Sequence, residues 1–484
     1  MVDMHDIPPE ILITAFEIGI FTFGISFLAP LSLVCQDWHD IINQTPRLWG
    51  IISIFKRTPP SALERQVTKA KASPLYIMIA PDARLSEHKK ALKELIDLAG
   101  NWVVADLGYE VVSATRWIDL YNSLEGLSLH GSRPTSTHND PWPFFEGITN
   151  NMKRGTKLHS FTANGISRPW TLGFLGPSIK YFSLRCGDNS VTLPSTRYQP
   201  PIRRDDQSKM MDTWDYLVRL PEATTIELQE LDHRGTPLAR PTIPLHNLNT
   251  LRLRHVRYSA QLLSSIAAPA LQILSIDHTL RYPNTFWYWQ VQEPNTPPPS
   301  MVPFFLAWSE PIHRPTNLHT LELINSIKQD DVPFLIRWLA RLPNLSCLYI
   351  KDDSYNAIGQ AAAHLLPDGQ ETDLYKALSR PVAGPDQPTW LCPSLSILHL
   401  DSTHEIADLI SIARGRSGID PPIYDIPPPK PLHILEAYFC AGAKEAEIEL
   451  LHSLVGQAYC LCLSCALDSK PRHTSSCSSD TTSV

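Results

Sequence analysis

The chain has 484 residues, and its 42 Lys and Arg against 49 Asp and Glu give a formal net charge of −7 at pH 7. This length suits two to four ordinary domains or one long repeat array. The acidic balance, without any basic block, argues against a nucleic-acid partner. The nine cysteines are scattered, and no basic region of an export signal precedes the first apolar run, so we expect reduced thiols and a cytoplasmic or nuclear location.

The chain is rich in proline, with 43 residues, and poor in glycine, with 21. A glycine-poor chain has few places where the backbone can wrap a phosphate. The motifs G-x-x-x-x-G-K-[ST], G-x-G-x-x-G, H-E-x-x-H and G-x-S-x-G are all absent from the sequence. The sequence therefore predicts a protein that is not an enzyme and uses no cofactor.

The first fifty residues carry three helical signals in succession. Pro8 or Pro9 suits the first turn of a helix that Asp6 could cap. A second helix is expected from about Leu31 to Ile42, because its apolar residues recur at helical spacing. Thr45-Pro46 repeats the cap-then-proline signal for a third, short helix. So small a unit buries too little surface to be stable alone, and it needs a neighbour.

This order of motifs resembles the F-box, a helical adaptor without chemistry of its own. The resemblance rests on three segments: Ile7-Pro8-Pro9-Glu10-Ile11-Leu12, Leu31-Ser32-Leu33-Val34-Cys35-Gln36-Asp37-Trp38 and Thr45-Pro46-Arg47-Leu48-Trp49. It implies binding to a Skp1-type linker within a cullin complex. The residues that the resemblance assigns to this contact are Ile7, Pro8, Ile11, Leu12, Leu31, Val34, Trp38, Leu48 and Trp49.

The stretch from Ile18 to Val34 contains no charged residue. A membrane-spanning helix needs about twenty apolar residues, and Gly19, Gly24 and Pro30 weaken this shorter stretch further. We therefore expect a loop and helix buried between the F-box partner and the next domain, and no membrane contact.

The remainder of the chain repeats the pattern apolar-x-x-apolar-x-apolar. The clear copies are Leu124/Leu127/Leu129, Ile179/Phe182/Leu184, Leu248/Leu251/Leu253, Leu271/Leu274/Ile276, Leu318/Leu321/Leu323, Leu345/Leu348/Ile350 and Leu395/Leu398/Leu400, with weaker ones at Leu158/Phe161, Ile226/Leu228 and Leu432/Leu435. The last two apolar residues of each copy are two apart, as in a strand with one buried face. Helical stripes lie between several copies, and strand, loop and helix in turn form the unit of a leucine-rich repeat.

The spacing of these copies is irregular. First positions are separated by 23 residues from Leu248 to Leu271 and by 27 from Leu318 to Leu345, but by 47 from Leu271 to Leu318 and by 50 from Leu345 to Leu395. The double-length intervals contain either a missed repeat or a long insertion. We expect an α/β solenoid with parallel strands, in which the second and third apolar residues of the copies from Leu251 to Leu400 face one core.

The whole chain resembles the fungal F-box proteins that carry degenerate leucine-rich repeats. The predicted fold is thus α/β, a three-helix F-box followed by an irregular leucine-rich-repeat solenoid. The predicted divisions are an F-box-like domain at 5–55, a connecting region and array cap at 56–120, the solenoid at 121–465 and a disordered tail at 466–484. The resemblance implies the substrate-recognition subunit of a Skp1-cullin-F-box ubiquitin ligase with an unidentified protein substrate. The alternative is a repeat scaffold outside the ligase, with a degenerate F-box.

The best candidate for substrate recognition is the aromatic cluster Phe286, Trp287, Tyr288 and Trp289, which lies inside a proline-rich insertion. The alternative is that these rings pack back over the solenoid. Cys460, Cys462 and Cys465 lack the second pair of ligands that a zinc site needs, so no metal is predicted. His399, Asp401 and His404 form no triad, since no nucleophile accompanies them. The acidic pairs Asp330-Asp331 and Asp352-Asp353 are interpreted as helix caps.

Overall fold

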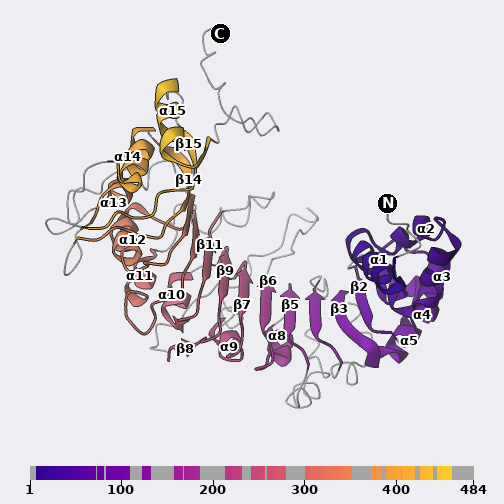
Figure 1. The fold of residues 1–484 in the computed structure, drawn as a ribbon. Helices are drawn as coiled ribbons and strands as arrows, with labels where there is room; N and C mark the ends of the chain where they lie inside the picture. Colours follow the sequence, from indigo (N-terminus) through magenta and orange to yellow (C-terminus); the bar gives the residue numbers. More distant parts are fainter. Residues whose placement is uncertain are drawn as a thin grey trace, which may run out of the picture. The chain divides into compact units, whose positions relative to one another are not determined.

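The computed structural model describes most of the chain, which forms two compact units, Met1–Arg203 and Arg204–Val484 (Figure 1). Each unit contains parallel strands joined by helices or loops. The described residues are 7–71, 73–80, 83–108, 123–131, 157–166, 168–185, 213–231, 241–256, 259–279, 300–351, 373–382, 388–404, 406–419, 426–439 and 444–460.

The first unit opens with five short or medium helical segments. They are α1 (Pro9–Phe23), η2 (Ile25–Phe27), α2 (Leu28–Leu31), α3 (Gln36–Gln44) and η3 (Pro46–Trp49). We call this segment, residues 7–49, the helical unit. The helix α1 begins with proline in its first turn, as predicted, and ends at Gly24, whose φ of 81° is accessible to glycine without strain. Asp6, the predicted cap, lies outside the described residues.

The prediction of one continuous second helix is wrong. The helix α2 ends at Leu31, and α3 begins only at Gln36. Cys35 between them has extended backbone, with φ −157° and ψ 169°. The apolar residues from Leu31 to Trp38 are therefore divided between two helices. The prediction failed because side-chain periodicity does not reveal where the backbone turns.

A small apolar core holds the helical unit together. Its buried residues are Leu12, Phe16, Ile20, Leu28, Ile42 and Leu48. Gly19 lets α1 pack closely against η2, because a Cβ atom there would overlap the ring of Phe27. Arg47 of η3 forms a two-point ion pair with Glu17 of α1, with one nitrogen–oxygen distance of 2.6 Å. Among the described residues, no helix is long and apolar enough to span a membrane.

The sheet of the first unit begins directly after the helical unit. Its strands, all parallel to their neighbours and in chain order, are β1 (Ile51–Ile54), β2 (Leu75–Ile79), β3 (Trp102–Gly108), β4 (Gly126–His130), β5 (Ser160–Asn164) and β6 (Tyr181–Arg185). The helical segments between them are α4 (Pro60–Ala70), η4 (Leu85–Glu87), α5 (Lys89–Asp97), η5 (Ala99–Asn101) and α8 (Arg168–Phe174). The strand β1 lies within the range 5–55 that was predicted as the F-box-like domain, so sheet and helical unit share that range.

The second unit contains a parallel sheet of the same kind. Its strands in order are β7 (Thr225–Gln229), β9 (Thr250–Arg254), β11 (Ile273–Asp277), β12 (Thr320–Ile324), β13 (Cys347–Lys351), β14 (Ile397–His404), β15 (Ile434–Phe439) and β16 (Gln457–Cys460). The helical segments are α9 (Thr213–Leu217), α10 (Ser259–Ser264), α11 (Val302–Ala307), η8 (Gln329–Asp331), α12 (Val332–Leu339), α13 (Leu374–Ser379), α14 (Ile406–Ser417) and α15 (Glu445–Leu454). Two short strands, β8 (Ile243–Pro244) and β10 (Ile266–Ala267), pair separately.

The repeating apolar pattern is the reason for this architecture. Figure 1 shows helical segments along one side of the strands of the second unit. The last two apolar residues of each predicted copy of the pattern are buried. The prediction of one core face is confirmed for Leu251, Leu253, Leu274, Ile276, Leu321, Leu323, Leu348, Ile350, Leu398 and Leu400, which are at most 2% exposed. The residues between them face the other side, which we call the open face of the sheet.

Hydrogen bonds at the carboxyl ends of the strands link each repeat to the next. The residue after a strand donates its N–H to the last carbonyl of the following strand, as from Glu230 to Arg254, His255 to Asp277 and Asn325 to Lys351. Glu230, His255 and Asn325 have φ values of 57°, 53° and 49°. These left-handed residues end the strands in register, so each repeat stops where its neighbour does.

The long intervals between repeats are insertions. The strand β11 pairs directly with β12, and β13 pairs directly with β14, so no strand of this sheet is missing between them. The aromatic cluster Phe286 to Trp289 and the predicted tail at 466–484 lie outside the described residues.

Candidate protein-interaction surfaces

One side of α1 exposes a row of apolar residues. Ile11, Ala15 and Ile18 follow one another at helical spacing, and Ile11 and Ile18 are 60% and 63% exposed. The opposite side of the same helix carries Leu12 and Phe16 into the core. An exposed apolar row on a helix that is already packed on its other side is typical of a protein-binding surface.

The turn between α2 and α3 exposes a second apolar segment. Leu33 and Val34 are 85% and 55% exposed, and their N–H groups bond back to Pro30 and Leu31. The turn is therefore ordered by its backbone, while its apolar side chains have no core to enter.

The nine residues assigned to linker binding fall into three groups. Pro8, Ile11 and Val34 are exposed. Leu12 and Leu48 belong to the core, and the partly buried Ile7, Leu31, Trp38 and Trp49 pack against it. The ring of Trp38 meets that of Phe16 edge to face at 5.1 Å. Six of the nine residues thus shape the unit and three are fully available to a partner.

Trp49 connects the helical unit with the first helix of the repeats. Its indole N–H donates to the carbonyl of Ile42 at 2.8 Å, and the ammonium of Lys69 on α4 lies 3.9 Å from its ring centroid. Burial, and then the charge of Arg65, lower the pKa of Lys69. Trp49 is thus held mainly by contacts within the chain.

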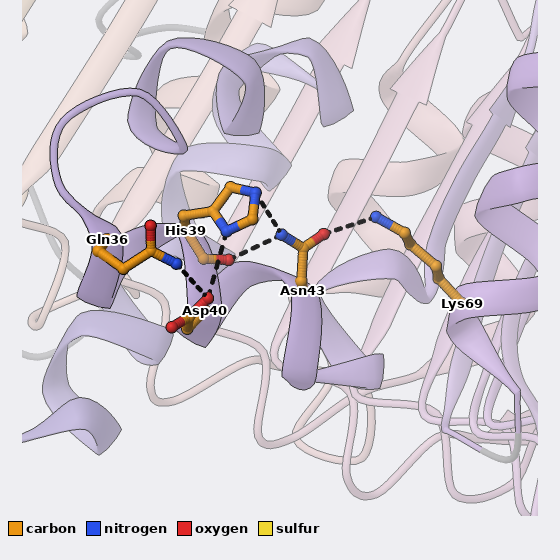
Figure 2. Close-up of polar contacts among 5 residues, drawn as sticks. All are labelled: Gln36, His39, Asp40, Asn43 and Lys69. Carbon is orange, nitrogen blue, oxygen red and sulfur yellow. Dashed lines mark hydrogen bonds and ion pairs between the residues drawn. The ribbon is translucent and has the colours of Figure 1, made fainter.

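A chain of polar contacts covers the outer side of α3 (Figure 2). The Lys69 ammonium donates to Asn43 Oδ1 at 2.7 Å, and Asn43 Nδ2 lies 3.0 Å from His39 Nε2. Asp40 Oδ1 in turn contacts His39 Nδ1 at 3.3 Å and accepts from Gln36 Nε2 at 2.9 Å. Of these contacts the Lys69–Asn43 bond joins α3 to α4 at the surface, and the others lie within α3.

The open face of the first unit carries a polar cluster. Asp106 Oδ1 lies 2.8 Å from His130 Nε2, and Ser128 Oγ lies 3.0 Å from the same nitrogen. The hydrogen bond to Asp106 raises the pKa of His130. In a serine hydrolase the serine and the aspartate use opposite ring nitrogens. Here both face Nε2 and Nδ1 faces Asn164 at 3.4 Å, so the arrangement differs from that of a serine hydrolase triad.

The open face of the second unit carries a row of polar side chains at the centre of its strands. In strand order the row is Glu227, Arg252, Ser275, Glu322, Tyr349, His399 and Glu436, each in register with the next. We call it the central row. Arg252 pairs with Glu227 at 2.7 Å, and His399 Nδ1 lies 2.5 Å from Glu436 Oε2.

Sequence reasoning did not identify the central row, although a signal was present. Every member occupies the x between the last two apolar residues of the repeat pattern. That position has to face away from the core, because neighbouring residues of a strand point to opposite sides.

The remaining sequence candidates lie in various places. Asp331 is buried and closes a capping box at the start of η8, where it accepts from Lys328 N–H at 3.1 Å, and it also accepts from Ser300 Oγ at 2.5 Å. It makes no side-chain cap bond to α12. Asp352 and Asp353 lie outside the described residues, as do Cys462 and Cys465. Among the described residues, no three His, Cys, Asp or Glu side chains come together as a metal site would require.

No protein-family model and no curated protein matches the chain. The solved structures that match include the crystal structure of a TLR13–ssRNA13 complex, at 12% sequence identity and a TM-score of 0.40. The match covers 83% of this chain and 44% of that one, so this chain spans less than half of its length.

Proposed function

We propose that the chain is the substrate-recognition subunit of a Skp1-cullin-F-box ubiquitin ligase. In this proposal the helical unit binds the Skp1-type linker, and the repeats bind a protein substrate. The ubiquitin-transferring cysteine lies in another protein of the pathway. The resemblance of the first fifty residues to the F-box supplies the identity of the linker.

The observation that carries the proposal is the exposed apolar surface of the helical unit. Ile11 and Val34, both assigned to the linker contact by the resemblance, are exposed on a unit whose own core is complete without them. Burying a side chain of this size contributes roughly 1.5–3 kcal/mol. A partner that covers these side chains would therefore gain this free energy on binding.

The repeats supply the second surface. Strands in a parallel array present their open faces side by side, which gives an extended area for protein contact. The central row on the second unit and the Asp106 cluster on the first unit each provide charged or hydrogen-bonding groups on the open face of their own unit. The aromatic cluster Phe286 to Trp289 remains a candidate for substrate contact on the basis of its sequence.

The test is co-purification of the full chain with the Skp1 protein of its host. We expect a complex at micromolar concentration, and a loss of at least tenfold in affinity for Ile11→Asp and Val34→Asp. Both residues are exposed, so the variants should keep the thermal melting curve of the parent. Leu306→Asp, at an apolar site of the second unit that is 51% exposed, is the matched control and should bind normally.

Failure of the parent protein to bind the linker would refute the proposal. A protein that still bound partners through its repeats would then be the scaffold outside the ligase. Equal loss of binding in the control variant would show that charge alone, and not the helical surface, determines the result.

A further inference from the structure

The part of the central row between β12 and β15 is acidic and contains an aromatic ring. Glu322, Tyr349, His399 and Glu436 lie on four successive strands, each in register with its neighbour. All four are partly exposed on the open face. The ring of Tyr349 lies 5.5 Å from that of His399, so the two rings form a floor between two carboxylates.

The Glu322 carboxylate is available to a ligand. Within the described part of the chain it has no ion-pair or hydrogen-bond partner, and its neighbour on β11 is Ser275, which is uncharged. Burial, and then the charge of Glu322, raise the pKa of the Cys347 thiol on the adjacent strand. The carboxylate therefore acts on this face as a negative charge without a matching base.

One of the two oxygens of the Glu436 carboxylate is available to a ligand. Its Oε2 is occupied by His399, and a carboxylate has a second oxygen that can accept further hydrogen bonds. Among the described side chains of β12 to β15, the alternation of the strands places Glu322, Glu436 and Lys351 on this face beside His399. The two carboxylates therefore outnumber the one ammonium.

The spacing of the two carboxylates indicates what could bridge them. Neighbouring strands are about 4.8 Å apart, so Glu322 and Glu436 are separated by roughly 14 Å across three strand intervals. An extended peptide rises about 3.4 Å per residue, which gives about 14 Å over four residues. Two side chains four residues apart in an extended peptide match the two carboxylates.

We propose that the open face from β12 to β15 binds an extended basic peptide segment with two Arg or Lys residues four positions apart. One guanidinium bonds to Glu322 while it stacks on Tyr349, as cations do over aromatic rings within about 6 Å. The other bonds to the free oxygen of Glu436. The proposal rests on the proposed function in that the segment belongs to the substrate protein, but the binding itself does not require the linker.

The experiment uses the full chain and fluorescein-labelled twelve-residue peptides of Gly, Ser and Ala. One peptide carries Arg-x-x-x-Arg, a second Arg-x-Arg, and a third Gln-x-x-x-Gln. Fluorescence anisotropy should show the first to bind at least fivefold more tightly than the second, with no binding of the third up to about 1 mM. Higher salt should weaken the binding, since the contacts are charged and partly exposed.

The variants Glu322→Gln and Glu436→Gln should each weaken binding of the first peptide about tenfold. Glu227→Gln is the matched control, because Glu227 lies in the same row but pairs with Arg252. It should leave the affinity within twofold, and all three variants should melt like the parent.

Three results would overturn the inference. They are absence of binding of the first peptide, an unchanged affinity in both Glu322→Gln and Glu436→Gln, and tighter binding of a single-stranded RNA of similar length. Because no linker is present in this assay, its failure leaves the linker proposal intact. Conversely, peptide binding together with a failed co-purification would refute only the proposed ligase role.

Discussion

Arg416 offers the sharpest test of how the second unit is held together. Its side chain is 1% exposed, and its guanidinium donates to the carbonyls of Leu391 at 3.1 Å, Cys392 at 2.8 Å and Leu395 at 3.4 Å. No carboxylate of the described residues contacts it. Helix α14 is thereby attached to the segment that leads into β14, and backbone dipoles are what compensate the charge.

The contribution of Arg416 to the free energy of unfolding follows from two opposing effects. Burial lowers the pKa of Arg416 from 12.5 to about 10, which corresponds to roughly 3 kcal/mol of cost for keeping the charge inside. Three hydrogen bonds from a charged donor contribute roughly 1.5–3 kcal/mol each. The bonds outweigh the burial cost, so Arg416→Met should lower the free energy of unfolding by about 2–5 kcal/mol.

Arg416→Lys separates charge from geometry. An ammonium is more strongly hydrated and cannot spread its donors over three carbonyls, so Lys should be no more stable than Met at this position. The measurement is pulse proteolysis across a urea series on the full chain. Arg414→Met, on the exposed side of the same helix, is the control and should change stability by less than about 0.5 kcal/mol. A Met variant within 1 kcal/mol of the parent would refute the reasoning.

Three further predictions can be measured by the same urea series. Gly19→Ala should cost about 1–3 kcal/mol, because the new methyl group overlaps the ring of Phe27; an unchanged midpoint would contradict this. Asp331→Ala should cost about 2–4 kcal/mol through the lost acceptor of Ser300 and Lys328, and a neutral result would mean that water replaces it. Burial lowers the pKa of His278 from 6.5 to about 4, so the unfolded chain takes up a proton at a higher pH than the folded chain does. The free energy of unfolding should therefore fall as the pH is lowered from about 6.5 to 4, by about 1–2 kcal/mol at pH 5. His278→Gln should flatten that dependence, and parallel curves for variant and parent would contradict it.

Much of the sheet could be predicted from the sequence, because repeats that each bury one strand face share a core by aligning their strands in one sheet. The repeat pattern was nevertheless not recognised in β1 and β3. Their patterns, Trp49/Ile52/Ile54 and Trp102/Ala105/Leu107, have the right spacing, but tryptophan or alanine stands where the other copies have mainly leucine. Trp102 is 2% exposed and Ala105 is fully buried, so both occupy core positions as leucine does in the other copies.

The pairing on the open face could not be predicted. His399 and Glu436 meet because β14 and β15 align in a particular register, and the register depends on where each strand ends. The sequence contains the two residues but no measure of that alignment. The break before Cys35 has a similar origin, since the apolar spacing continues through it and only the backbone changes direction.

Hydrogen bonds at the carboxyl end of a strand align it with its neighbour, so this chain can tolerate connections of different length between its strands. A step of 23 residues from Leu248 and a step of 47 from Leu271 deliver the next strand to the same register. The register of each strand is set by backbone hydrogen bonds to the adjacent strand and not by the number of residues in the connection. Doubling a connection costs only about 0.6 kcal/mol in loop entropy. New segments can therefore enter between repeats during evolution without moving the residues of the central row on either side.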